Sequence, residues 1–147
     1  MDTVVNILVR SHSGLRWIVL ALLIAAIFNA TMKKKSGIYS EGDRKLNLFA
    51  MIFMHIQLLI GLVLYFTSSK VSFEYMFESS LNRFYGLEHV FGMILAIILV
   101  TVGHSKSKRA EDPAKKHKTI FIAYIFALIL IVASIPWPFR NLGGSWF

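Results

Sequence analysis

Four long apolar segments constrain this chain more than any other feature of its sequence. They cover residues 14–32, 46–67, 84–103 and 119–136, and each is about 18–22 residues long. A helix of about 20 apolar residues is long enough to cross a hydrocarbon core of about 30 Å. Because unpaired backbone groups are not tolerated in lipid, each segment must be helical. The sequence therefore predicts an all-α, four-transmembrane-helix bundle, with residues 1–147 forming a single integral membrane domain.

Composition supports this fold class and removes several kinds of chemistry. Hydrophobic residues make up 56% of the chain and charged residues only 16%, and there is no cysteine. The absence of cysteine excludes disulfides, covalent haem attachment, iron–sulfur clusters and thiolate zinc sites. The chain also has no hydrolase or transferase motif. If it takes part in catalysis, we expect it to be an electron-transfer component at most.

The basic residues predict the topology. Eleven of the sixteen Lys and Arg residues lie in two connections, 33–45 and 104–118, and the other five are scattered. Under the positive-inside rule these two loops are cytoplasmic and both termini are outside. The basic residues behind the net charge of +8 lie between the apolar segments rather than along one helix face. We therefore do not expect nucleic acid as a partner.

The segments on the outer side have a different character. Residues 70–84 mix aromatic and charged side chains and are expected to form a short interfacial helix. Two prolines flanking Trp137 end the last span. Beyond it, aromatic side chains suit an anchoring belt at the level of the lipid headgroups, namely Trp137, Phe139, Trp146 and Phe147.

Three of the five histidines lie in or beside the apolar segments, where burying an ionisable group is costly. At a rise of about 1.5 Å per residue, His12 lies near the outer boundary, His89 roughly 7 Å below it and His55 roughly 18 Å below it. By contrast, His104 is expected to be solvated at the inner edge, and His117 to be a loop residue between lysines.

Matching depth makes His12 and His89 the best candidates for the two iron ligands of one haem b. A bis-imidazole site needs two neutral histidines on opposite sides of the porphyrin. His55 is about 10 Å too deep on this count and is expected to be an alternate ligand or a quinone-site donor. Arg16 and Glu88 lie at a similar depth, so we expect them to form an ion pair that orients the imidazoles.

Other residues are compatible with a macrocycle at this depth. Gly61, Gly86 and Gly92 leave room for a porphyrin or for close helix packing. Basic side chains near the outer surface would neutralise haem propionates, namely Arg10, Arg16 and Arg83.

Two alternatives remain open for these histidines. Each intramembrane histidine could simply hydrogen-bond a neighbouring helix, as polar residues in bundles often do. A zinc or iron site made of His12, His89 and Glu88, or a proton path through the same groups, is also compatible with the residue types.

Three sequence strings carry a resemblance to a known family. They are HSGLRW at residues 12–17, FMHIQLLIGLVLYF at 53–66 and RFYGLEHVFGMILAI at 83–97. These strings resemble a family of small four-span bacterial membrane proteins labelled cytochrome B, and the loop GHSKSKRAEDPAKKHK and the closing SIPWPF are similar to it as well. The resemblance implies haem binding, with histidines in the first three spans at His12, His55 and His89. The chain departs from the diheme cytochrome b561 pattern, because only one histidine pair at matching depth can be drawn.

Together these observations favour a b-type-cytochrome-like protein of the bacterial inner membrane. It would bind one haem near the outer leaflet and exchange electrons with quinol or with a partner protein. The main alternative is a non-catalytic accessory subunit whose His and Glu side chains form interhelical hydrogen bonds. Beyond the lipid bilayer, the expected partners are a quinone and a larger membrane complex or a second copy of the chain.

Overall fold

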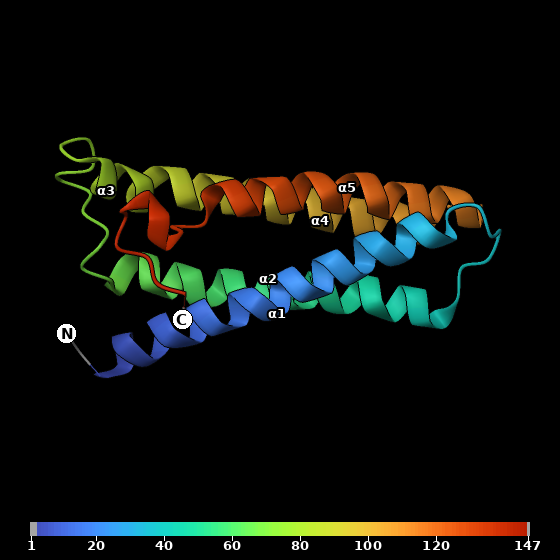
Figure 1. Ribbon diagram of the computed structural model, residues 1–147, viewed down its shortest axis with the longest axis horizontal. Coiled ribbons are helices and arrows are strands. Elements are labelled where there is room, and N and C mark those ends of the chain that lie inside the picture. The colour runs from blue at the N-terminus through green and yellow to red at the C-terminus, as the bar shows by residue number, and fades with distance from the viewer. Residues whose placement is uncertain (1–2, 147) are drawn as a thin grey trace.

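The computed structural model describes residues 3–146, and all regular structure in that range is helical. Four long helices lie alongside one another in a bundle, as Figure 1 shows: α1 (Thr3–Lys33), α2 (Glu41–Thr67), α4 (His89–Arg109) and α5 (Pro113–Ser134). A short helix α3 (Ser80–Arg83) and a π-helical turn η1 (Phe84–Glu88) precede α4 without a break. The four helical segments are long and apolar enough to cross a membrane, which confirms the predicted all-α, four-helix architecture.

The helices are longer than the apolar segments that predict them. The first begins at Thr3 rather than near residue 14, and the connections predicted at 33–45 and 104–118 shrink to 34–40 and 110–112. Asp112 explains the second difference, because its carboxylate accepts hydrogen bonds from the backbone N–H groups of Ala114 and Lys115. With Pro113 at the first helical position, this cap starts α5 early. Hydropathy marks the lipid-facing part of a helix, whereas caps set its ends.

Small residues bring the helices together. The contact faces carry fully buried alanines, and α4 approaches α5 most closely at two glycines. A Cβ added to Gly103 would lie 2.2 Å from the Cβ of Ala123, and one added to Gly92 would lie 2.0 Å from Ser134 Oγ. Small side chains at helix contacts are typical of membrane bundles. The four long helices pack in a ring in the order α1, α2, α4, α5, and the contact between α2 and α4 is the smallest of the four.

The outward faces of the bundle carry large apolar side chains. Phe66 is 71% exposed, Phe28 is 66% exposed and Phe91 is 60% exposed. In water such a surface would be an aggregation hazard, whereas in a bilayer it faces hydrocarbon. The exposed surface thus agrees with a multi-pass membrane protein.

The chain after α5 folds back over one end of the bundle (Figure 1). We call residues 135–146 the tail and this end the tail end; the opposite end, where α1 ends and α5 begins, is the lysine end. Arg140 fastens the tail to α5, because its guanidinium donates to the carbonyls of Ala133 (2.7 Å) and Ile135 (3.1 Å). Gly144 passes so close to Pro136 that an added Cβ would lie 1.7 Å from the Pro136 carbonyl oxygen.

The aromatic residues of the tail cluster with α1 instead of forming a spread belt. The ring centres of Trp17 and Trp137 are 6.1 Å apart, and those of Trp137 and Trp146 are 5.8 Å apart. Phe147 lies outside the described residues. The interfacial helix expected over 70–84 is reduced to the single turn α3 that leads into η1, with turns before it.

Candidate functional site

A partly open cavity of about 190 Å³ lies inside the tail end, between α1, α2, α4 and the tail. Most of its wall is apolar. The polar residues that line it come from different elements, and they are His12, Ser13, Arg16, Gln57, Tyr65, Ser68, Lys70, Tyr85, His89 and Ser145. A mostly apolar cavity with a few converging polar groups is the usual form of a small-molecule site.

The cavity contains the two histidines that the sequence pairs. His12 projects from α1 and His89 from the first turn of α4, and their ring centres are 6.3 Å apart with the ring planes at 69°. The predicted proximity of these two side chains is therefore confirmed. Their role as ligands stays a prediction.

The hydrogen bonds of these residues leave ring nitrogens available. His89 Nδ1 lies 2.7 Å from the carbonyl oxygen of Ser134. Because a carbonyl only accepts, Nδ1 carries the proton and Nε2 of the neutral ring is a free acceptor. The ring Nδ1 of His12 is buried and has no hydrogen-bond partner, although the His12 backbone carbonyl accepts from Gln57 Nε2 at 2.8 Å. A buried polar atom without a partner is costly unless a ligand satisfies it.

The separation of the two rings fits one metal between them. A metal–imidazole bond is about 2 Å long and the bonding nitrogen lies about 1.1 Å from the ring centre, so two opposed imidazoles on one metal have ring centres about 6 Å apart. Within residues 3–146, no group of three or more His, Cys, Asp or Glu side chains is placed to hold a metal ion. A metal bound here could take no more than these two imidazoles as His, Cys, Asp or Glu ligands from the described residues.

The predicted ion pair between Arg16 and Glu88 is wrong. Arg16 donates instead to the backbone carbonyls of Ser145 (3.1 Å) and Trp146 (2.8 Å). Glu88 pairs with Arg83 at 2.7 Å, and both of these side chains are about half exposed. The sequence could not show that the tail returns to α1 and offers its carbonyls to Arg16. Glu88 is thereby removed from the immediate surroundings of the imidazoles, and a His12–His89–Glu88 metal site is not formed.

His55 lies apart from the histidine pair. Its Nδ1 is 2.8 Å from the Met51 carbonyl oxygen, and its Nε2 is 3.4 Å from the hydroxyl of Thr101 on α4. It is not among the residues that line the cavity. The structure therefore places His55 as an interhelical contact between α2 and α4, outside the lining of the cavity.

Side chains that sequence reasoning missed tie the tail over the cavity. Lys70 donates to the Gly143 carbonyl at 2.9 Å, and the Tyr85 hydroxyl donates to the Leu142 carbonyl at 3.0 Å. Trp17 Nε1 likewise donates to the Trp146 carbonyl at 2.9 Å. Apart from two adjacent glycines at 143 and 144, the sequence gives no signal that these residues form a cover.

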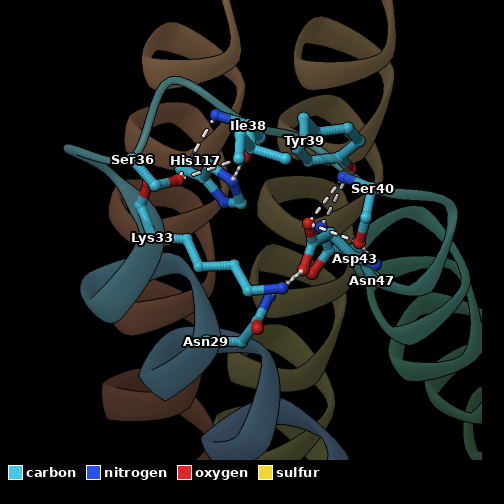
Figure 2. A network of polar contacts seen from close by, with 9 residues as sticks. All are labelled: Asn29, Lys33, Ser36, Ile38, Tyr39, Ser40, Asp43, Asn47 and His117. Atoms are coloured by element: carbon cyan, nitrogen blue, oxygen red, sulfur yellow. Dashed lines mark hydrogen bonds and ion pairs between the residues drawn. The ribbon is translucent and has the colours of Figure 1, made fainter.

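A second polar cluster, at the lysine end, also escaped the sequence analysis. Figure 2 shows Asp43 joining the end of α1 to the start of α2. One carboxylate oxygen accepts from Asn29 (2.8 Å) and Lys33 (2.7 Å), and the other accepts from the backbone N–H (2.7 Å) and the hydroxyl (2.8 Å) of Ser40. The Ser40–Asp43 part is a capping box. With four donors on a side chain that is 2% exposed, Asp43 is saturated.

The prediction of a solvated loop position for His117 is wrong. It lies in the second turn of α5 with 0% exposure, where Nε2 is 2.9 Å from the Ile38 carbonyl oxygen and the ring packs on Tyr39 (Figure 2). Because α5 already begins at Pro113, residue 117 falls on the same inward face as Tyr124. His104 also differs from expectation, since it lies within α4 and its Nδ1 is buried without a partner.

Comparisons with known proteins do not add to this geometry. No protein-family model, no curated protein and no solved structure matches the chain. The resemblance to the cytochrome B-labelled family therefore stays a prediction.

Proposed function

We propose that this chain is a b-type-cytochrome-like membrane redox protein that binds one haem between His12 and His89. The observation that carries the proposal is the ring-centre separation of 6.3 Å across a largely apolar cavity. When bound, the haem would supply reversible one-electron chemistry.

The chain's own residues would hold the imidazoles ready. The Ser134 carbonyl fixes the tautomer and orientation of His89, an arrangement common for metal-binding histidines. Gln57 holds the His12 backbone against α2. Gly61 leaves space beside His12, because an added Cβ would lie 3.1 Å from His12 Cε1.

Room for a macrocycle comes from the seam between α2 and α4, where these helices touch least. The partly open cavity of about 190 Å³ is smaller than a porphyrin, so binding one would require the helices that line it to move apart. Gly86 and Gly92 do not supply the space, since Met76 packs against the first and Ser134 against the second. Of the three glycines considered from sequence, only Gly61 lines the cavity.

Arg16 and Lys70 stand at the mouth of the cavity as candidate partners for haem carboxylates. Both side chains now donate to tail carbonyls. A carboxylate at the mouth would compete with the tail for these cations. Electron exchange with quinol or a partner protein would take place at this end. Under the positive-inside rule, the basic residues at the opposite end favour an outward-facing position for it in a bacterial inner membrane.

The test is a reduced-minus-oxidised absorption spectrum of the protein purified in mild detergent after expression with haem supplied. We expect a sharp α-band and one haem per chain. His89→Ala and His12→Ala should each remove or broaden the band. His104→Ala and His55→Ala should leave it in place, because neither side chain lines the cavity.

Absence of any haem band from folded wild-type protein would overturn the proposal. In that case the accessory-subunit function would gain support, because His89–Ser134 and His55–Thr101 do connect neighbouring helices. These two hydrogen bonds alone do not favour the accessory-subunit function. Hydrogen bonding between helices does not explain why Nδ1 of His12 is buried without a partner.

A further inference from the structure

Two lysine clusters that are far apart in sequence meet at the lysine end. The last residues of α1 lie beside the first turns of α5, as Figure 1 shows. Between them runs an open groove with four lysines on its rim, Lys34, Lys35, Lys115 and Lys118. The remaining groove residues are Asp112, Ala114, Thr119, Phe121 and Ile122.

The four ammonium groups lack a carboxylate partner in the described part of the chain, and that of Lys34 lies 5.7 Å from the centre of the Phe121 ring. All four side chains are exposed, and within residues 3–146 none of them has a carboxylate within 4 Å. The one acidic side chain in the groove, Asp112, already accepts from two backbone N–H groups of α5. Neighbouring Lys33 and Lys116 differ, because the first pairs with Asp43 and the second donates to the carbonyls of Ser107 and Lys108.

Charge is concentrated at this end of the molecule. The two connections with their flanking helix turns, residues 33–45 and 104–118, hold eleven basic and four acidic residues, a formal balance of +7, while the rest of the chain has a balance of +1. Like charges placed this close repel one another unless anions neutralise them. The groove is therefore complementary to an anion.

Below the lysines the surface changes to exposed apolar side chains. On α1, Met32 and Phe28 are both 66% exposed, lie four residues apart on one helix face, and precede Lys34 and Lys35 in the chain. On α5, Ile122 and Phe126 are 44% and 57% exposed and follow Lys118 at helical spacing. An occupant of the groove would therefore have an anionic part at the lysines and apolar chains along α1 and α5.

We propose that this groove is a binding site for an anionic phospholipid. Basic pockets between membrane helices bind such headgroups through lysine ammonium groups. The acyl chains would lie on the apolar faces of α1 and α5. The groove shares no lining residue with the cavity that contains the histidine pair, and the proposal does not depend on haem binding.

The test is native mass spectrometry of the purified protein in detergent, titrated with tetraoleoyl cardiolipin and, separately, with phosphatidylcholine. We expect cardiolipin to bind more tightly than phosphatidylcholine, which has a phosphate but no net charge. Because each lysine near an anionic lipid contributes about fivefold to affinity, the K34Q/K35Q/K115Q/K118Q variant should bind cardiolipin at least ~20-fold more weakly.

A charge-matched variant separates a defined site from general attraction. K45Q/K106Q/K108Q/R109Q removes the same charge from exposed side chains at the same end but outside the groove. It should lose no more than about threefold in affinity, because longer-range charges are largely screened. Equal weakening in both variants, or no weakening in the groove variant, would overturn the proposal. Circular dichroism and a single thermal transition verify that each variant is folded.

Discussion

The polar clusters at the two ends of the bundle differ in how completely their atoms are bonded. At the lysine end, the Asp43 carboxylate accepts four hydrogen bonds. At the tail end, His12 has a buried ring nitrogen without a partner, and His89 uses only one of its two. His104, His117 and Asn47 also each have an unpartnered buried atom, but none of the three lines the tail-end cavity or the lysine groove. A saturated cluster serves the fold, whereas unsatisfied nitrogens facing a cavity are suited to a ligand.

The largest expected effect on stability is at the saturated cluster. Asp43→Ala removes the acceptor of four donors, including the N3 half of the capping box that begins α2, so the free energy of unfolding should fall by about 3 kcal/mol. Chemical or thermal unfolding in detergent measures this change. Glu41→Ala is the matched control, because this neighbouring carboxylate forms only an exposed pair with Arg44 and should show no measurable change. Equal effects of the two substitutions would refute a special role for Asp43.

The next largest effect is expected where the tail closes over the cavity. Gly144→Ala places a methyl group against the Pro136 carbonyl, which forces the tail to shift at a cost of about 2 kcal/mol. Tryptophan emission should move to longer wavelength as the cluster around Trp146 loosens. Gly14→Ala is the control, since nothing lies within 4 Å of its added Cβ. An unchanged emission spectrum in Gly144→Ala would show that the tail does not depend on this close approach.

A smaller stability effect is expected at the unsaturated cluster. Without haem, His89→Ala should lower the free energy of unfolding by about 1 kcal/mol, the value of one hydrogen bond to Ser134. The same substitution should nevertheless abolish the haem spectrum. If haem-free His89→Ala were as unstable as Asp43→Ala, the contrast between the two ends would fail and His89 would be a structural residue.

The smallest effect is expected at Glu88. In the structure this carboxylate pairs with Arg83 in a half-exposed position, so Glu88→Gln should change stability by less than about 0.5 kcal/mol. The haem spectrum should also be unaffected. A large spectral change in this variant would instead support the Arg16–Glu88 pair expected from the sequence.

Hydropathy and helix geometry were sufficient for the fold and for the histidine pair. Apolar length predicts four helices, and counting about 1.5 Å per residue brings His12 and His89 to within roughly 7 Å of the same depth. The same count correctly separates His55 from them. These predictions succeed because they depend only on the period and direction of single helices.

The remaining contacts could not be predicted because they depend on where non-helical segments return. Arg16 contacts the tail at Ser145, which follows it by 129 residues in the sequence. Asp43 is saturated only because the 34–40 link turns back on α1. His117 is buried because the Asp112 cap starts α5 four residues before it. Its lysine neighbours in the sequence instead predict a solvated loop.

The central claim is that His12 and His89 together bind one haem iron. Electron paramagnetic resonance of the oxidised protein tests it most directly, because two imidazole ligands give low-spin iron and the loss of one gives high-spin iron. We expect a low-spin spectrum for the wild type, and high-spin iron or no bound iron for both His12→Ala and His89→Ala. A low-spin spectrum that persists in either variant would contradict the claim.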